Sequence, residues 1–331
     1  MSRPSRSARR LVGVAAVAAF ALSGCGSSVV GVREAPSQTT TTAPITADSA
    51  QQIASRVLGK AQEARDAKGD AADTLRKEAL TGTALAVATA AAKVEPADSS
   101  TATAPVERTE QPKVLAISRG TAWPRVILAQ TTEPDGRLVL NLLTSPDAAT
   151  PFRLSSSATM QSGASVAALD AVTAGSPLVA EDTKDPVAPA ELLKAYAGAL
   201  AYPKPTATKA VDTTDPFSTA VKANAAAQAK SFGKLATLTQ VHTPQPDPVA
   251  IRLKDGGLLV FGLLSRTDAI KLASGGKSLT PSAEFQKLVK KKTLTKDAEL
   301  RTYETVVLTV PPKGEASVVA VDQTLYSAKG A

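Results

Sequence analysis

The stretch "GLLVFGLLS", residues 257–265, is the segment that says most about the fold of this chain. It follows the Asp-Gly pair at 255–256, and the apolar stretch "PVAIRLK" comes directly before that pair. Two apolar stretches separated by an Asp-Gly pair predict a β-hairpin, because this pair readily adopts the backbone conformations of a tight turn. The C-terminal part of the chain is therefore expected to contain an antiparallel sheet.

A second segment repeats this pattern. "GRLVLNLLT", residues 136–144, aligns with residues 257–265 without gaps, and it too is preceded by an Asp-Gly turn and another apolar strand. In both parts of the chain a helical pattern comes before the strands. Because the order of elements is shared as well as the hairpin, the sequence predicts two related domains that arose by duplication.

The order of the predicted elements defines the fold class. Helices are expected after Thr46, a good N-cap residue, and from Pro216, which follows the N-cap residue Asp215. Series of alternating strands follow each helix. We therefore predict an α+β protein in which each of two related domains has a leading helix packed on a curled antiparallel sheet. The expected boundaries are 46–202 for the first domain, 203–214 for a linker and 215–331 for the second domain.

The N-terminal residues predict a secretory signal. Four arginines between residues 3 and 10 precede an apolar run, residues 11–22, which is too short to be a permanent membrane span. "LSGC", residues 22–25, resembles the bacterial lipobox and ends in the only cysteine of the chain. The resemblance implies cleavage before Cys25, a diacylglycerol on its thiol and acylation of the new N-terminus.

We therefore expect residues 1–24 to be a lipoprotein signal peptide and Cys25 to be the lipidation site. An ordinary signal peptide with an incidental cysteine is the alternative, and export by either the general or the twin-arginine route stays open. Residues 25–45 are rich in Ser, Thr and Pro and predict a flexible tether with a reach of about 25 Å. The folded part is then held at the outer face of the cell membrane.

The tandem α+β pattern resembles the nuclear transport factor 2-like, or cystatin-like, superfamily. The resemblance covers roughly residues 46–329 and depends on the order of elements and on the two Gly- and Leu-rich strands. Alanine supplies much of the 43% hydrophobic content, which is typical of a high-GC genome. Together with the lipobox, this composition resembles that of actinobacterial lipoproteins with tandem domains of this type. That superfamily includes enzymes, ligand binders and assembly adapters, so the resemblance alone implies no function.

The charge gives no support for a nucleic-acid partner. The formal charge of +8 includes the arginines of the signal peptide, and the remaining chain is only about +4. The single dense basic run, around residues 287–296, is interpreted as a solvated helix face, with contact to anionic lipid headgroups as the alternative. It comprises Lys287, Lys290, Lys291, Lys292 and Lys296.

Few residues are candidates for catalysis or metal binding. His242, the only histidine, ends a predicted strand just before a Pro-rich turn, and we interpret it as a loop residue without a catalytic role. A zinc site of the usual His and Cys kind cannot be built from one histidine and a lipidated cysteine. Glu181, Asp182 and Asp185 lack the ligand spacing and the turn glycine of a calcium loop, so they predict a solvated loop.

Two further motifs are weak. Ser274 and Lys277 match the S-x-x-K pattern of penicillin-recognising enzymes, but no K-T-G or S-x-N partner follows, so we interpret the segment as a turn. The overlapping "GGKS" lacks the first glycine of a phosphate-binding loop, where Lys271 stands. Trp123 and Phe152 stand beside predicted strands and are expected in the core, with a place in a concave pocket as the alternative.

These observations predict a membrane-anchored extracytoplasmic lipoprotein that acts as a non-catalytic binding or assembly module of the cell envelope. The alternatives are a binder of a small apolar ligand and, least favoured, an envelope hydrolase. No catalytic or metal residues and no cofactor are predicted. The expected partners are the membrane, through Cys25, and either an envelope protein or a small apolar ligand.

Overall fold

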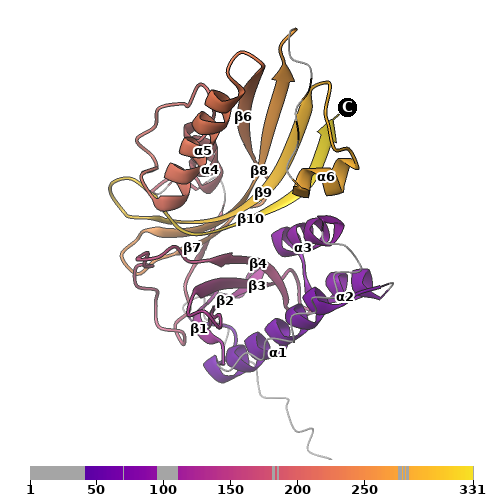
Figure 1. Ribbon diagram of the computed structural model, residues 1–331. Helices are drawn as coiled ribbons and strands as arrows, with labels where there is room; N and C mark the ends of the chain where they lie inside the picture. The colour runs from indigo at the N-terminus through magenta and orange to yellow at the C-terminus, as the bar shows by residue number, and fades with distance from the viewer. Residues whose placement is uncertain are drawn as a thin grey trace, which may run out of the picture. The chain divides into compact units, whose positions relative to one another are not determined.

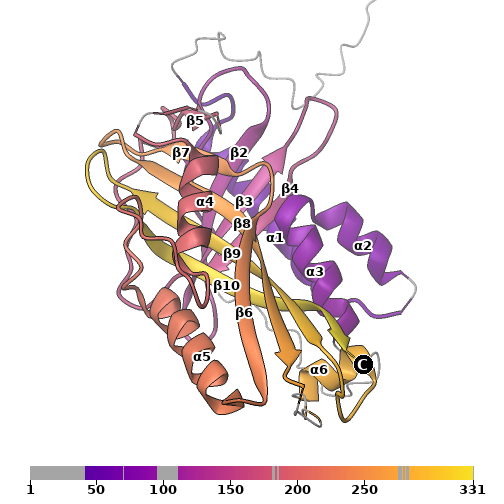
Figure 2. The same cartoon turned by 90° about the horizontal axis from the view of Figure 1, so that it is seen from above.

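Two antiparallel sheets pack face to face, and helices cover their outer faces (Figures 1 and 2). The structure is a computed structural model that describes residues 42–69, 71–94, 111–180, 183–184, 186–274, 278, 280 and 283–330. The described residues belong to one compact unit. The predicted α+β class with antiparallel sheets is confirmed. The signal peptide, Cys25 and residues 25–41 of the tether lie outside the described residues.

The first sheet has four strands in sequential order; α1 lies on its outer side, and α2 and α3 lie at its β4 edge (Figure 1). Apolar side chains of α1 and its neighbours pack on the outer sheet face and form a core with Ile127, Leu143 and Leu154. The helices are α1 (Ala47–Asp66), α2 (Ala72–Ala79) and α3 (Gly82–Val94). The strands are β1 (Lys113–Ile117), β2 (Arg125–Thr132), β3 (Leu138–Ser145) and β4 (Arg153–Thr159).

The second sheet is larger and has the order β10-β9-β8-β7-β5, with β6 paired to the second half of β8. Its helices, α4 (Pro189–Ala199) and α5 (Pro216–Phe232), lie on the side away from the first sheet (Figure 2). A short helix, α6 (Ala283–Val289), lies near β10. The strands are β5 (Leu178–Val179), β6 (Ala236–Pro244), β7 (Val249–Arg252), β8 (Leu258–Leu272), β9 (Ala298–Val310) and β10 (Ser317–Gly330).

Local sequence explains where the leading helices begin. The hydroxyl of Thr46 accepts a hydrogen bond from the backbone N–H of Ser49, and the carboxylate of Asp215 accepts from the N–H groups of Phe217 and Ser218. Both side chains satisfy donors that the first turn of a helix leaves free. The two predicted N-caps are thus confirmed.

The two sheets share an apolar core to which both hairpins contribute. Among its members are Leu128, Leu140 and Leu142 of the first sheet and Leu259, Phe261 and Val307 of the second. In the gapless alignment of the two segments, Leu140 pairs with Phe261, and both face this shared core. Leu143 pairs with Leu264, and both face helices. These two aligned pairs therefore lie in equivalent environments, as expected if the strands are related.

The two Asp-Gly turns also have the same local geometry. Asp135 accepts a hydrogen bond from the N–H of Arg137, and Asp255 accepts one from Gly257. The glycine between them has a φ of 83° at 136 and 90° at 256, in the region that only glycine adopts readily. Both predicted hairpins are present.

The change from one sheet to the other occurs earlier in the chain than the predicted linker. The helix α4 falls within the expected first domain, 46–202, but packs on the second sheet. In the expected linker, 203–214, Val211 is buried and forms a bridge to Ala316. Apolar side chains on α4 and at position 211 explain this, because both complete the core on the outer face of the second sheet.

Gly262, within the opening stretch, allows α4 to approach β8 closely. A Cβ atom on Gly262 would lie 2.5 Å from Cδ1 of Leu193, whose side chain is fully buried. A buried leucine in a packed core has little room to move. Gly262 therefore sets the distance between the helix and the second sheet.

We predict that Gly262→Ala lowers the free energy of unfolding by about 2 kcal/mol, because the added methyl overpacks this contact. In a Leu193→Ala background the same substitution should cost much less, since the clashing atoms are gone. Denaturant titration of the four proteins measures this coupling.

Gly59→Ala, on the exposed side of α1 with no atom near the new Cβ, is the control and should stabilise by about 0.5–1 kcal/mol. Equal costs of Gly262→Ala in both backgrounds would contradict the proposed close approach.

Candidate functional site

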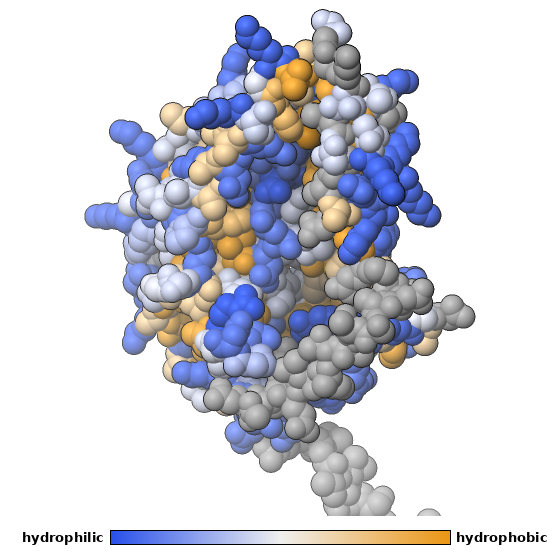
Figure 3. Space-filling view, viewed as in Figure 1, coloured by the Kyte–Doolittle hydropathy of each residue, from blue (hydrophilic) through white to orange (hydrophobic). Residues whose placement is uncertain are grey.

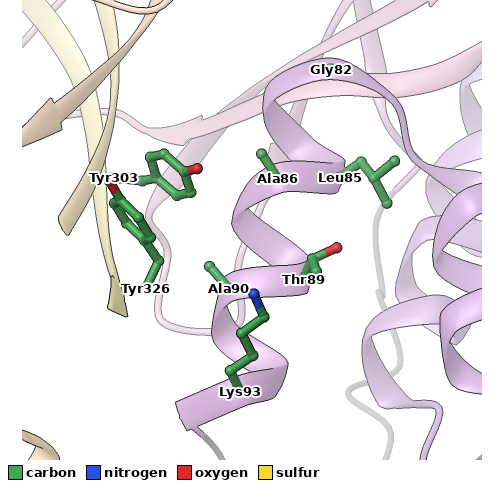
Figure 4. Close-up of a pocket in the computed structure, with 8 residues that line it drawn as sticks. All are labelled: Gly82, Leu85, Ala86, Thr89, Ala90, Lys93, Tyr303 and Tyr326. Carbon is green, nitrogen blue, oxygen red and sulfur yellow. The ribbon is translucent and has the colours of Figure 1, made fainter. Parts of the chain in front are cut away.

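A pocket of about 330 Å³ lies between α3 and the C-terminal strands of the second sheet (Figure 4). The helix contributes six lining residues, and β9 and β10 contribute one tyrosine each. The lining residues are Gly82, Leu85, Ala86, Thr89, Ala90, Lys93, Tyr303 and Tyr326. We call this site the α3–tyrosine pocket. Its volume lies at the lower end of the range for small-molecule sites.

The two tyrosines form a rigid aromatic wall. Their ring centroids are 3.9 Å apart and their planes differ by 14°. The hydroxyl of Tyr326 is hydrogen-bonded to the hydroxyl of Ser265, with 2.8 Å between the oxygens. Tyr303 forms no hydrogen bond through its hydroxyl to the described residues, and this group points toward α3 (Figure 4). Burial raises the pKa of Tyr303, so its hydroxyl is protonated at neutral pH.

Strand pairing and alternation place the two tyrosines on the same sheet face, because Tyr303 pairs with Thr324 and Tyr326 follows Thr324 by two residues. The pairing of β10 with β9 shifts between Leu325 and Ser327, so Tyr326 has no partner of its own in β9. Such bulges are frequent beside active sites. Tyr326 stays on the face that carries Tyr303, where the two rings stack.

The pocket exists because the two sheets have strands of different length. The strands of the first sheet have 5 to 8 residues, whereas β8, β9 and β10 have 15, 13 and 14. The distal parts of the long strands therefore extend beyond the shared core. Helix α3 contacts both β4 and β10 and partly covers this extension. The small side chains of Ala86 and Ala90 leave the space between helix and tyrosines open (Figure 4).

A buried polar cluster occupies the opposite face of the same strands. Glu304 accepts hydrogen bonds at 2.9 Å from Arg266 and from Gln323, and its other oxygen is 2.8 Å from Nδ1 of His242. Arg266 also pairs with Asp268 at 3.0 Å. The cluster joins β6, β8, β9 and β10, so it holds in register the strands that carry the tyrosines.

The charges in this cluster stabilise one another. Burial raises the pKa of Glu304, but the hydrogen bond and charge of His242 and the charge of Arg266 outweigh it. The pKa of Glu304 therefore lies below its ordinary value of 4.5. The side chains of His242 and Glu304 are fully buried. This cluster is thus a structural ion-pair network, and it does not line the α3–tyrosine pocket.

The expectation for His242 needs correction. His242 lies inside β6 and is buried, because Glu304 provides a hydrogen-bond partner for its Nδ1 atom, whereas the Pro-rich sequence after it indicated a loop. Its Nε2 atom has no hydrogen-bond partner among the described residues.

The other candidate residues lie apart from the pocket. Trp123 is 38% exposed and stacks against the guanidinium of Arg125, 4.4 Å from the ring centroid, so its expected place in the core is wrong. Phe152 packs at the margin of the first core, as expected. The five lysines between 287 and 296 are all exposed. Glu181, Asp182, Asp185 and Lys277 lie outside the described residues, and no group of three metal-ligating side chains occurs in the described part.

Sequence reasoning missed Tyr303 and Tyr326. Aromatic residues make up only 3% of the chain, and two of its four tyrosines lie in the last two strands. This enrichment was an available signal. Their stacking was not predictable, because it depends on the register between β9 and β10, which no local pattern specifies.

We predict that Glu304→Gln lowers the free energy of unfolding by about 3 kcal/mol at neutral pH, because it removes the carboxylate that Arg266 and the buried His242 share. A lowered pKa in the folded state adds stability above pH 4.5, and this stability is lost as the pH falls through the folded pKa. As the pH is lowered, the free energy of unfolding should therefore fall less steeply for Glu304→Gln than for the natural protein.

Denaturant titrations between pH 3 and pH 7 measure this difference, with the exposed Glu315→Gln as the control. Parallel pH dependences in the natural protein and Glu304→Gln would show that Glu304 has no lowered pKa.

No curated protein and no solved structure matches the chain. A family model described as Domain of unknown function (DUF8094) matches residues 44–330, which include all helices and strands described above. The match extends over both sheets, the buried polar cluster and the α3–tyrosine pocket. The chain belongs to this DUF8094 family.

Proposed function

We propose that this protein is an extracytoplasmic lipoprotein, anchored at the outer face of the cell membrane through Cys25, that binds a small apolar ligand without catalysing a reaction. The observation that carries the binding role is the α3–tyrosine pocket, which combines a recess of about 330 Å³ with an aromatic wall. Between the two non-catalytic alternatives, this pocket favours a small ligand over an envelope protein.

The distribution of exposed apolar side chains supports this choice. A docking surface for a protein usually presents a contiguous apolar patch. The apolar colour in Figure 3 is divided into separate areas among hydrophilic ones. The large apolar residues that are more than a third exposed lie on α2, before β2, on β3 and on or beside β6. They are Leu75, Trp123, Leu138, Leu235 and Val241.

The position of the acid–base groups supports a role without catalysis. A general base must reach the proton it removes. His242 and Glu304 are buried on the sheet face opposite Tyr303, where Glu304 contacts both His242 and Arg266, and neither lines the pocket. An envelope hydrolase therefore receives no support from the described residues.

The anchor is proposed on the basis of the sequence. The lipobox-like "LSGC" at 22–25 implies the lipid on Cys25, and the Ser- and Thr-rich residues after it provide the tether. Among the described residues, no helix has the length and apolar character needed to cross a bilayer. Two acyl chains would suffice to retain the protein on the membrane.

We further propose that the halves are related domains of the nuclear transport factor 2-like type. The equivalent environments of Leu140 and Phe261, and of Leu143 and Leu264, support a common origin. Helices on the outer face of each curled sheet are in keeping with that fold class. The shared core would then be the interface between the two copies.

We predict that Cys25→Ala moves the protein out of the membrane fraction, or leaves it with its signal peptide attached, because the only lipidation site is lost. Fractionation followed by mass measurement of the N-terminus distinguishes these forms from the mature lipoprotein. Retention of a normally processed protein on the membrane would contradict the anchor.

We predict that native mass spectrometry of the intact lipoprotein, gently extracted from its own membrane, shows a small added mass beyond the lipid anchor. Ala86→Trp should abolish this added mass, because the indole fills the space beside Tyr303 (Figure 4). Ala92→Trp, on the exposed side of the same helix, is the matched control and should retain it.

The same spectra test the alternative. A co-extracted protein in place of a small mass would make this chain an adapter. The bare lipoprotein in every sample would contradict ligand binding. Thermal unfolding of both tryptophan variants shows whether they remain folded.

A further inference from the structure

The lining of the α3–tyrosine pocket limits the shape of the ligand. On one side, Ala86 and Ala90 present single methyl groups, and on the other side stand the stacked rings of Tyr303 and Tyr326 (Figure 4). The recess between the alanine methyl groups and the tyrosine rings suits a flat apolar group, because such a group can contact both sides at once. Aromatic rings also favour offset or edge contacts with another ring.

The charge of the lining limits the ligand further. Lys93 is the one residue with a formal charge among the eight that line the pocket. It lies in the last turn of α3, and its ammonium group forms no ion pair or hydrogen bond with the described residues. The lining therefore offers an unpaired positive charge.

A second polar group is available on the aromatic wall. The hydroxyl of Tyr303 points toward α3 and has no hydrogen-bond partner among the described residues (Figure 4). The hydroxyl of Tyr326, in contrast, is already bound to Ser265. A ligand in the pocket can thus accept hydrogen bonds from both Lys93 and Tyr303 while its apolar part fills the space beside the alanines.

We propose that the ligand of this pocket is a small organic acid, with a flat apolar body and one carboxylate that Lys93 binds. The inference rests on the proposed binding function and adds the chemical class of the ligand. The alternative role of Lys93 is local, because a cation in the last turn stabilises a helix through its dipole. The test must therefore separate ligand charge from helix stability.

The experiment compares two probes of nearly the same shape, of which one is charged and the other neutral. 2-Naphthoate carries a carboxylate and 2-naphthamide is its neutral counterpart, and the fluorescence of both reports binding. The protein is the full-length lipoprotein in lipid nanodiscs, with empty nanodiscs as the blank for partitioning. We expect naphthoate to bind at least about fivefold more tightly than naphthamide. The affinity for naphthoate should fall as the salt concentration rises, because salt screens the charge of the Lys93 ammonium group.

Lys93→Gln is the decisive variant. It should lower the affinity for naphthoate about fivefold and leave the affinity for naphthamide unchanged. Lys60→Gln, at an exposed position of α1, is the matched control and should change neither affinity. Thermal unfolding of Lys93→Gln measures any loss of helix stability separately from the difference between the probes.

Three results would overturn the inference. Equal binding of both probes would show that the ligand needs no negative charge. In that case, a loss of probe binding in Ala86→Trp would still support the pocket as the ligand site. An equal effect of Lys93→Gln on both probes would assign Lys93 to helix stability. Failure of both probes to bind would exclude flat aromatic acids, whereas the co-extracted mass decides independently whether the pocket binds any ligand.

Discussion

The face-to-face packing of two sheets with strands of unequal length is the constraint on which the rest of this structure depends. Apolar side chains such as Leu140 and Phe261 bury each other between the sheets. This contact leaves the outer faces to the helices and the distal parts of β8, β9 and β10 beyond the shared core. The α3–tyrosine pocket lies at those distal parts.

The two faces of these distal strands have separate tasks. On one face, Glu304 is surrounded by His242, Arg266 and Gln323, and this network fixes the register of four strands. On the other face, Tyr303, the residue next to Glu304, forms the pocket wall with Tyr326. Alternation along a strand thus couples the ion-pair network to the position of the aromatic wall. A strained or shifted network would displace the tyrosines.

Local features of this fold could be predicted from the sequence, and long-range features could not. The hairpins at 135–136 and 255–256 and the N-caps at Thr46 and Asp215 depend on neighbouring residues and are confirmed. The buried setting of His242 depends on Glu304, 62 residues away, and was missed. The pocket requires α3 to contact the last strands of the second sheet, and no local sequence pattern predicts that contact.

The central claim is that α3 lies against the tyrosine pair on the extended strands. Methyl-selective NMR of the alanine residues tests it most directly, because methyl groups near aromatic rings show shifted resonances and nuclear Overhauser effects to ring protons. We predict that the methyl resonances of Ala86 and Ala90 are shifted and show such effects to Tyr303 or Tyr326. Unshifted resonances without contacts to either ring would contradict the arrangement from which the pocket and its ligand are inferred.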